Sequence, residues 1–207
     1  MSLILISSFK LVLKMDNLIE PRYSIAIMPP KSGIDYVNEL KNSLCTAINW
    51  FNSKNSKAHV TISEFVADDD EIEKIINQLK DLSSYEKPFH VNFEGVSSYK
   101  NGAVFITPDG NSKIALKQLM LNIQKGLKIK NVNHSKDPHM SIGRKLSEDN
   151  VATALKMFAD VKLNFDCVGL VLRKFNPDIK VRQYEVLNHD FKFLGNEPKP
   201  NLQQSLF

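Results

Sequence analysis

The sequence has little cysteine and no long hydrophobic run. Cys45 and Cys167 are its two cysteines, and neither belongs to a CxxC or other metal-spaced pair. We therefore expect two reduced thiols rather than a disulfide bond or a metal site. The most apolar stretch, residues 3–13, is interrupted by two serines and a lysine, whereas a membrane-spanning helix needs about 20 apolar residues. Because no secretory signal pattern opens the chain, we expect a cytoplasmic protein with no membrane partner.

The composition is that of an ordinary globular domain. The 207 residues are 43% hydrophobic and 24% charged, which suits a domain with a hydrophobic core and excludes disordered or low-complexity classes. The net charge of +4 is unevenly spread, because residues 100–145 hold nine basic side chains and two acidic ones. Such a local excess attracts anions, but it is equally typical of a solvated, lysine-rich helix face. Charge alone leaves both interpretations open.

Hydrophobic periodicity predicts alternating strands and helices. Strands are expected at residues 23–28, 58–65, 89–96, 103–107, 138–144 and 163–173, with one or two more at 180–194. Helices are expected at residues 34–51, 68–79, 116–127 and 147–158. Asp68 or Asp69 would open the second helix and Ser147 would cap the last one. The order strand, helix, strand, helix, strand thus occurs twice.

The two halves repeat in their spacing. Corresponding landmarks are 79 or 80 residues apart: Tyr23 and Ala103, His59 and His139, and Asp68 and Ser147. Solenoid repeats are shorter, about 20–50 residues. The spacing therefore predicts two similar lobes that face each other.

These landmarks set the expected domain organisation. One bilobal domain would cover residues 21–195, with lobes at about 21–98 and 99–179 and C-terminal strands at 180–195. Residues 1–20 would form an N-terminal extension and residues 196–207 a loose tail. Residues 1–14 fit none of the elements that follow, which leaves Met15 open as the start of the native chain.

A histidine and a hydroxyl recur on one face of the central strand in each half. Residues two apart in a strand share a face, so His59, Thr61 and Ser63 are expected to point away from the apolar residues between them. His139 and Ser141 have the same alternation in the second half. Because the helices must cover the apolar faces, the two polar pairs are expected together, in a cleft where the lobes meet.

The pattern His-x-Thr/Ser at matching positions of a repeat favours catalysis over two coincidental surface histidines. Phosphodiester transfer needs one group to take a proton from the attacking oxygen and another to give one to the leaving oxygen. With a pKa of about 6.5, one imidazole can be the base while its partner is the acid. The hydroxyls of Thr61 and Ser141 can donate hydrogen bonds to the phosphate oxygens. No third ligand stands at zinc-site spacing, so a two-histidine metal site is the weaker interpretation.

The motifs Ala-His59-Val-Thr61-Ile and Pro-His139-Met-Ser141-Ile-Gly-Arg144 resemble those of the two-histidine phosphoesterase superfamily, in its 2'-5' RNA ligase-like branch. The resemblance covers residues 23–187. It implies an α/β (α+β) bilobal fold with two pseudo-twofold-related lobes, each an antiparallel-rich sheet with helices on its outer face, and a central cleft. It also implies a metal-independent phosphodiesterase without a cofactor.

The implied substrates are RNA ends or small nucleotides that carry 2',3'-cyclic phosphates or 2'-5' linkages, with ATP-independent ligation as the reverse reaction. By the family pattern, His59 and His139 are the acid/base pair, and Thr61 and Ser141 contact phosphate. Arg144 matches a basic residue of the second motif, with a surface position at a strand end as the equal alternative. A monomer is expected.

Two tyrosines are further candidates for the cleft. Tyr184 lies in a C-terminal strand that resembles the family's cleft-closing segment, although plain sheet packing is favoured. Tyr99 could stack on a base, but a hairpin turn with Asn101 and Gly102 is favoured. The other three histidines, His90, His134 and His189, are not expected to be catalytic.

Two further functions remain open from the residues alone. The same cleft could hold a nucleotide or an RNA end without turnover. The basic stretch could instead define an RNA-binding domain that does not need the histidines and binds in a strongly salt-dependent way. The residues do not decide which histidine is the base or which linkage is cut.

Overall fold

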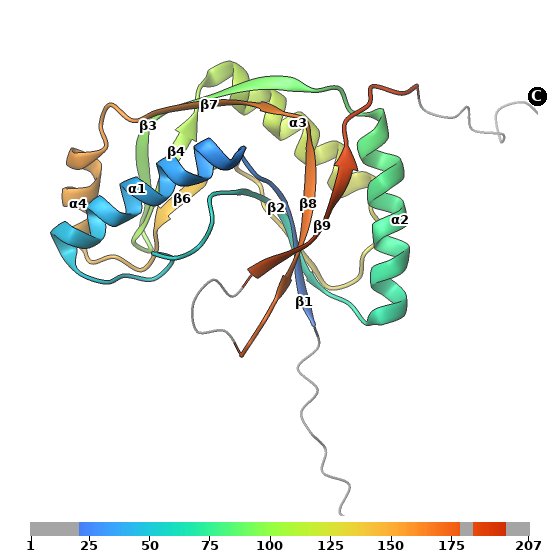
Figure 1. The fold of residues 1–207 in the computed structure, drawn as a ribbon, viewed down its shortest axis with the longest axis horizontal. Coiled ribbons are helices and arrows are strands. Elements are labelled where there is room, and N and C mark those ends of the chain that lie inside the picture. The colour runs from blue at the N-terminus through green and yellow to red at the C-terminus, as the bar shows by residue number, and fades with distance from the viewer. Residues whose placement is uncertain (1–20, 179–183, 198–207) are drawn as a thin grey trace, which may run out of the picture.

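The computed structural model describes residues 21–178 and 184–197 (Figure 1). In this part of the chain, nine strands and four helices follow one another in this order: β1 (Arg22–Ile27), α1 (Lys31–Ile48), β2 (Val60–Val66), α2 (Asp69–Tyr85), β3 (Phe89–Tyr99), β4 (Ala103–Pro108), α3 (Gly110–Gly126), β5 (Val132–His134), β6 (Met140–Gly143), α4 (Glu148–Met157), β7 (Lys162–Cys167), β8 (Gly169–Phe175) and β9 (Tyr184–Lys192).

The strands form two antiparallel sheets. One has five strands in the order β5-β2-β1-β8-β9, and the other has four in the order β6-β4-β3-β7. The predicted α+β fold with two similar, antiparallel lobes is therefore confirmed. The triplet β2-β1-β8 matches the triplet β6-β4-β3, since each holds the first strand of one half of the chain and the strand that contains the hydroxyl of its His-x-Thr/Ser motif.

The third member of each triplet comes from the other half of the chain. Strand β3 joins the sheet of β4 and β6, while β8 joins the sheet of β1 and β2. The sequence boundary near residue 98 therefore separates the two repeats but not the two sheets. In each sheet the first strand of one repeat pairs with a strand of the other repeat, β1 with β8 and β4 with β3. Strands β1 and β4 are therefore not open edges of their sheets.

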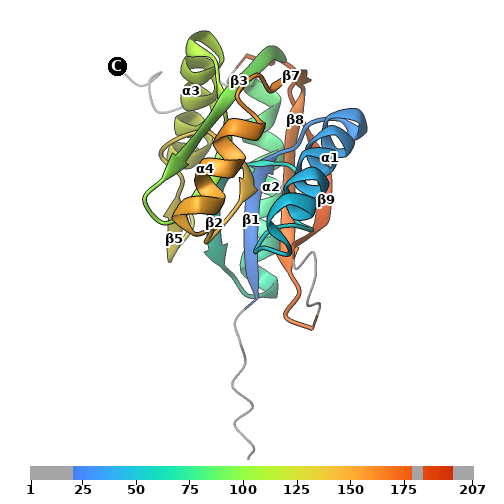
Figure 2. The same ribbon diagram turned by 90° about the vertical axis from the view of Figure 1, so that its left-hand side faces the viewer.

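The first helix of each half contacts the other half of the chain. Helix α1 packs against α4, β6 and β7, whereas α3 packs against α2 and against strands of both sheets, β3 and β4 of one and β2 of the other. Gln124 of α3 fixes the contact with β2, because its amide donates to the carbonyl of Ile62 at 2.9 Å. Figure 2 shows α1 and α4 together in front of the strands. The apolar residues of both sheets and all four helices belong to one buried cluster.

The strand expected at residues 163–173 is two strands in different sheets. Strand β7 ends at Cys167 and pairs with β3, and β8 starts at Gly169 and pairs with β1 and β9. Gly169 fits the start of β8 because an added Cβ would lie 2.6 Å from the carbonyl oxygen of Phe191 in β9. The sequence pattern hides this change of sheet, because buried residues alternate along β7 and continue into β8.

The sequence signals for the helix starts are confirmed. Asp68 caps α2 by accepting from the amide of Glu71 at 2.8 Å, and the Glu71 side chain completes a capping box. Ser147 caps α4 by accepting from the amide of Asn150 at 3.4 Å. Such caps satisfy amides that have no partner inside the helix.

The ends of the chain are described in part. The predicted extension at residues 1–20 and most of the predicted tail, 198–207, lie outside the described residues. Asn196 is still bound to the fold, since its amide donates to the carbonyl of Ser84 in α2 at 2.9 Å. Cys45 and Cys167 are both free thiols, as expected. Among the described residues, no helix has the length and apolar character needed to cross a membrane.

Candidate active site

His59 stands directly before β2, at the end of the loop that follows α1. Its imidazole is 9% exposed, and its Nδ1 lies 2.7 Å from the carbonyl oxygen of Lys57. Thr61 follows in β2 and is half-buried. The first His-x-Thr motif is thus held where a loop enters the five-stranded sheet.

The second motif has the same local geometry. His139 stands directly before β6, and its Nδ1 lies 2.9 Å from the carbonyl oxygen of Asp137. Ser141 follows in β6 and is half-buried. In both motifs the imidazole is therefore bound to the backbone carbonyl two residues earlier.

This shared contact fixes the tautomer of both rings. A carbonyl oxygen only accepts, so each Nδ1 must carry a hydrogen. In a neutral ring the lone pair then lies on Nε2, where it can take a proton, and in a charged ring Nε2 can give one. Within the described residues, neither Nε2 has a hydrogen-bond partner. Each histidine is oriented by the backbone and keeps its reactive nitrogen free.

Arg144 connects the two motifs. Its positive charge lowers the pKa of both His59 and His139. Coulomb interactions weaken with distance and are screened by solvent, so one cation that acts on both rings lies near both. The backbone gives a second connection, because the Arg144 amide donates to the carbonyl of Asn52, in the loop before His59, at 3.3 Å.

The pKa values of the two histidines are lowered to different degrees. Burial, followed by the charges of Arg173, Lys41 and Arg144, lowers the pKa of His59 well below its usual value, against a smaller opposing effect of the Lys57 carbonyl. Burial also lowers the pKa of His139, but the carbonyl and the carboxylate of Asp137 counteract it. His59 is therefore the harder ring to protonate.

Two aromatic side chains hold the ring of His139. The centroid of Tyr99 lies 5.5 Å from that of His139 in an edge-on contact, and the centroid of Phe105 lies 4.9 Å away. The expected hairpin is also present, with Gly102 at a φ of 75° and its Cβ position only 2.2 Å from the carbonyl oxygen of Leu146. Tyr99 thus ends β3 at the expected turn and packs beside the second motif, while its stacking on a base stays a prediction.

Asp137, whose carbonyl binds the His139 ring, is itself held by three side chains. Its carboxylate accepts from the Tyr99 hydroxyl at 3.2 Å and lies 3.0 Å from Nζ of Lys113 and 3.6 Å from Nζ of Lys117. Burial works to raise the pKa of Asp137, but the bonds and charges of Lys113, Tyr99 and Lys117 outweigh it and lower that pKa. Two lysines of the basic stretch therefore stabilise the loop of the second motif.

A hollow of ≈ 460 Å³ opens beside the second motif. Its lining consists of the ring of His139 and its neighbours on the four-stranded sheet: Tyr99, Asn101, Ala103, His139, Ser141, Arg144 and Lys145. The predicted phosphate contacts Ser141 and Arg144 thus share one hollow with His139, whereas His59 and Thr61 of the first motif do not line it. This is a concave, cationic place that suits an anionic ligand.

Arg173 in β8 is a buried cation whose effect on the first motif the sequence did not reveal. The residue is 3% exposed, its Nη2 donates to Ser24 at 2.7 Å, and its charge acts on His59. Its Nε has no hydrogen-bond partner in the described part of the chain. The sequence signal for Arg173 is its position inside an apolar strand pattern. Arginine is almost never fully buried without a partner, so an arginine at such a position indicates a special role.

Tyr184 lies next to this arginine. The Arg173 guanidinium carbon is 5.1 Å from the centre of the Tyr184 ring, and the Phe175 ring meets Tyr184 edge-on at 5.3 Å. Tyr184 therefore belongs to the same region of the five-stranded sheet as the cation that acts on His59. Its pKa is raised by burial and by the charge of Glu64.

An irregularity in the pairing of β2 with β1 corrects one detail of the sequence interpretation. Thr61 pairs with Ala26 and Ser63 pairs with the adjacent Ile25, so Ile62 of β2 has no partner in this ladder. Directly paired residues share a face. Ser63 therefore lies on the face opposite Thr61, where its hydroxyl is 2.9 Å from Nδ1 of His134.

The three remaining histidines are engaged elsewhere or exposed. Apart from His134, whose contact with Ser63 is given above, His90 pairs with Asp166 across β3 and β7 at 2.8 Å. His189 lies exposed in β9. Nothing in these positions brings them to the two motifs.

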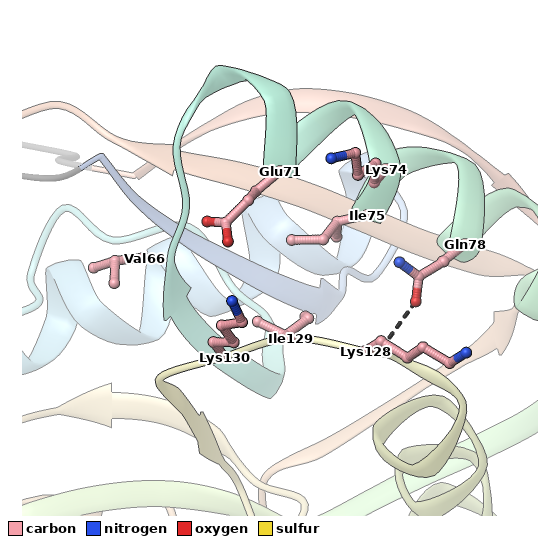
Figure 3. Close-up of a pocket in the computed structure, with 8 residues that line it drawn as sticks. All are labelled: Val66, Glu71, Lys74, Ile75, Gln78, Lys128, Ile129 and Lys130. Carbon is pink, nitrogen blue, oxygen red and sulfur yellow. Dashed lines mark hydrogen bonds between the residues drawn. The ribbon is translucent and has the colours of Figure 1, made fainter.

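A second hollow lies at the far end of β2. It measures ≈ 300 Å³ and is formed by α2 and residues 128–130, where Gln78 accepts from the amide of Lys128 at 2.8 Å (Figure 3). Val66, the last residue of β2, lines it, about 20 Å along the strand from His59. None of the residues predicted for the active site lines this hollow. Within the described residues, no group of three or more histidine, cysteine or acidic side chains could hold a metal ion.

Each of the two antiparallel sheets is thus entered by a histidine, with a hydroxyl two residues later. The chain belongs to the 2'-5' RNA ligase superfamily, whose family model matches residues 29–178. No curated protein matches the chain.

Solved structures share the fold at low sequence identity. TT0787 of Thermus thermophilus is 16% identical, with a TM-score of 0.64, and the match covers 85% of this chain and 100% of that one. LigT of E. coli, solved in complex with 3'-AMP, is 14% identical, with a TM-score of 0.58, and the match covers 82% of this chain and 97% of that one. LigT has also been solved in complex with NADP+.

Proposed function

We propose that this protein is a phosphodiesterase that acts on RNA-type 2',3'-cyclic phosphates or 2'-5' phosphodiester linkages by paired-histidine acid/base catalysis. The observation that carries the proposal is the matched pair of imidazoles. Each has Nδ1 bound to the carbonyl two residues earlier and a hydroxyl two residues later, and one arginine acts on both. Membership of the 2'-5' RNA ligase superfamily supports this reaction class.

We assign the general base to His59 and the general acid to His139. The cations around His59 keep its ring neutral, which leaves the Nε2 lone pair available for a proton. His139 has the Asp137 carboxylate beside it, which favours the protonated ring. A bound phosphodiester is itself an anion and raises the pKa of a nearby imidazole further.

The hydrolytic step follows from this division. A water oxygen bonds to phosphorus while its proton passes to Nε2 of His59. The bond from phosphorus to one ribose oxygen breaks, and that oxygen takes the Nε2 proton of His139. Thr61, Ser141 and Arg144 can donate hydrogen bonds to the non-bridging oxygens, whose charge grows in the transition state. With a ribose hydroxyl in place of water, the same groups would run the reaction towards ligation.

The expected partners are RNA ends or small nucleotides. The cationic hollow beside His139 supports an anionic ligand, and LigT is a structural relative that has been solved with nucleotides. A protein that binds such a ligand in the same cleft without turnover is the alternative.

Incubation with 2',3'-cyclic nucleotides and 2'-5' dinucleotides tests the proposal. Products would be separated chromatographically so that 2'- and 3'-monophosphates are resolved. The proposal predicts multiple turnovers that yield one of the two monoesters, and it predicts that a chelator leaves the rate unchanged. Stoichiometric binding with no ring opening or bond cleavage would instead establish the non-catalytic binding module.

A further inference from the structure

Lys41 of α1 is a buried basic side chain without an acidic partner in the described part of the chain. The residue is 1% exposed. Lysine is rarely buried in this way unless it is paired, since removal of a charge from water is costly. In the described part of the chain, no carboxylate forms an ion pair with Lys41. Its ammonium group instead donates to the carbonyl oxygens of Ser56 at 2.6 Å and Ser53 at 3.3 Å.

Both carbonyls belong to one tight loop, residues 51–56. The loop is closed by turns in which the amide of Lys54 donates to Phe51 and that of Ser56 donates to Ser53. Ser53 has a φ of 71°, in the left-handed region that disfavours a residue with a side chain. The Lys41 ammonium therefore binds the carbonyl of the strained residue Ser53 and the carbonyl of Ser56.

The opposite side of the loop is bound to the second motif. The Ser53 hydroxyl donates to the carbonyl of Ile142 in β6 at 3.3 Å. The Arg144 amide donates to the carbonyl of Asn52, also at 3.3 Å. The loop therefore contacts the strand that contains Ser141 and continues to Arg144.

The same loop leads directly to His59. The carbonyl of Lys57, directly after the loop, accepts from the His59 imidazole. Helix α1 packs on the four-stranded sheet, whereas His59 enters the five-stranded one. A lysine on α1 that fixes loop 51–56 thus fixes one histidine relative to the sheet that holds the other.

We propose that Lys41 is a positioning residue that sets the geometry between the two histidines by anchoring loop 51–56. The proposal rests on the proposed function, because it assigns Lys41 a role in that reaction. Lys41 does not touch the reacting atoms in this account. It acts through the loop and, as a cation, on the protonation of His59.

The charges around Lys41 and His59 fit this role. Burial, then Arg144 and Lys54, lower the pKa of Lys41 to about 7. Lys41, in turn, is one of three cations, with Arg173 and Arg144, that lower the pKa of His59. It is not among the groups that act on His139. Its removal should therefore change the titration of one histidine only.

Three variants at this position separate anchoring from charge. K41M removes both the donors and the charge, K41Q keeps a donor without charge, and K41R keeps both. K31M is the matched control, because Lys31 is an exposed residue of the same helix and pairs only with Asp35 in the described structure. Each variant is made in the full chain, and its folding is checked by circular dichroism and by its melting temperature.

Two measurements decide the outcome. For K41M we expect kcat to fall by about 100-fold with little change in KM, as for a small misplacement of catalytic groups, with K41Q intermediate, K41R closest to wild type and K31M unchanged. NMR titration of the histidine rings should show a raised pKa for His59 and an unchanged pKa for His139 in K41M and K41Q.

The titration also separates this proposal from the proposed function. If the wild-type protein turns over none of the substrates, the proposed function fails, whereas the titration still reports whether Lys41 acts on His59. Unaltered kcat and an unaltered His59 titration in a folded K41M protein would overturn the role of Lys41. If K41M does not fold, kcat and the His59 titration are compared between K41Q and K41R. Equal values in these two variants would then overturn the role of Lys41.

Discussion

The two halves of the site have the same backbone geometry and different surroundings. In both, an imidazole is bound through Nδ1 to the carbonyl two residues earlier, directly before a strand. His59 is almost fully buried, and every charged side chain that shifts its pKa is a cation. His139 is partly buried and has a carboxylate as well as a cation beside it. The repeat thus duplicates the orientation of the rings, while residues outside the motifs make their protonation unequal.

Removal of either imidazole tests this division with the largest expected effect. H59A and H139A should each lower kcat by about 10²–10⁴-fold, the usual contribution of a general acid or base. Their pH–rate profiles should differ, because loss of the base removes the limb that rises with pH and loss of the acid removes the limb that falls.

H90A is the control for these two variants. His90 pairs with Asp166 on a different pair of strands and should be replaceable without loss of turnover. Full activity in either H59A or H139A would contradict the paired mechanism, and identical pH profiles would contradict the division of roles.

Removal of the carboxylate behind His139 should make the two halves more alike. In D137N the pKa of His139 should fall, because the Asp137 charge raises it, and kcat should drop by about tenfold through loss of charge-assisted hydrogen bonds. Y99F, which removes one neutral donor to Asp137, should cost only about fivefold. Ring titration by NMR should show that His59 is unaffected in both, and a shift of both rings would show that the halves are not electrostatically separate.

The smallest expected effect is on stability. Both histidines have a lowered pKa in the folded protein, so as the pH falls below about 6.5 the unfolded chain takes up protons first. The free energy of unfolding should therefore decrease as the pH drops from 7 to 5. H59Q should remove more of this dependence than H139Q, as measured by urea unfolding at several pH values. An equal change in the two variants would indicate equal surroundings.

The order of elements and the two motifs could be predicted from the sequence because both are local. Apolar spacing of two or three to four residues marks strands and helices, and residues such as Asp68 and Ser147 mark helix starts. The pairing of His59 with Thr61, and of His139 with Ser141, also follows from strand alternation alone. The convergence of the two motifs stays a prediction, supported by the effect of the Arg144 charge on the pKa of both rings.

The exchange of strands between the halves could not be predicted in this way. Residues 163–173 have one strand-like pattern, and only the pairing of β7 with β3 and of β8 with β1 reveals the change of sheet. Ser63 changes face because Ile62, between Thr61 and Ser63, has no partner in the ladder of β1 and β2. The burial of Lys41 and Arg173 depends on which elements cover them, and that is a property of the assembled fold.

The central claim is that both imidazoles bind one phosphate group. Titration of the wild-type protein with adenosine 2'-monophosphate, observed through the ring signals of His59 and His139, tests this claim most directly. The account predicts that both signals shift along one saturation curve and that both pKa values rise in the complex. A response of one ring alone, or of neither at saturating ligand, would contradict it.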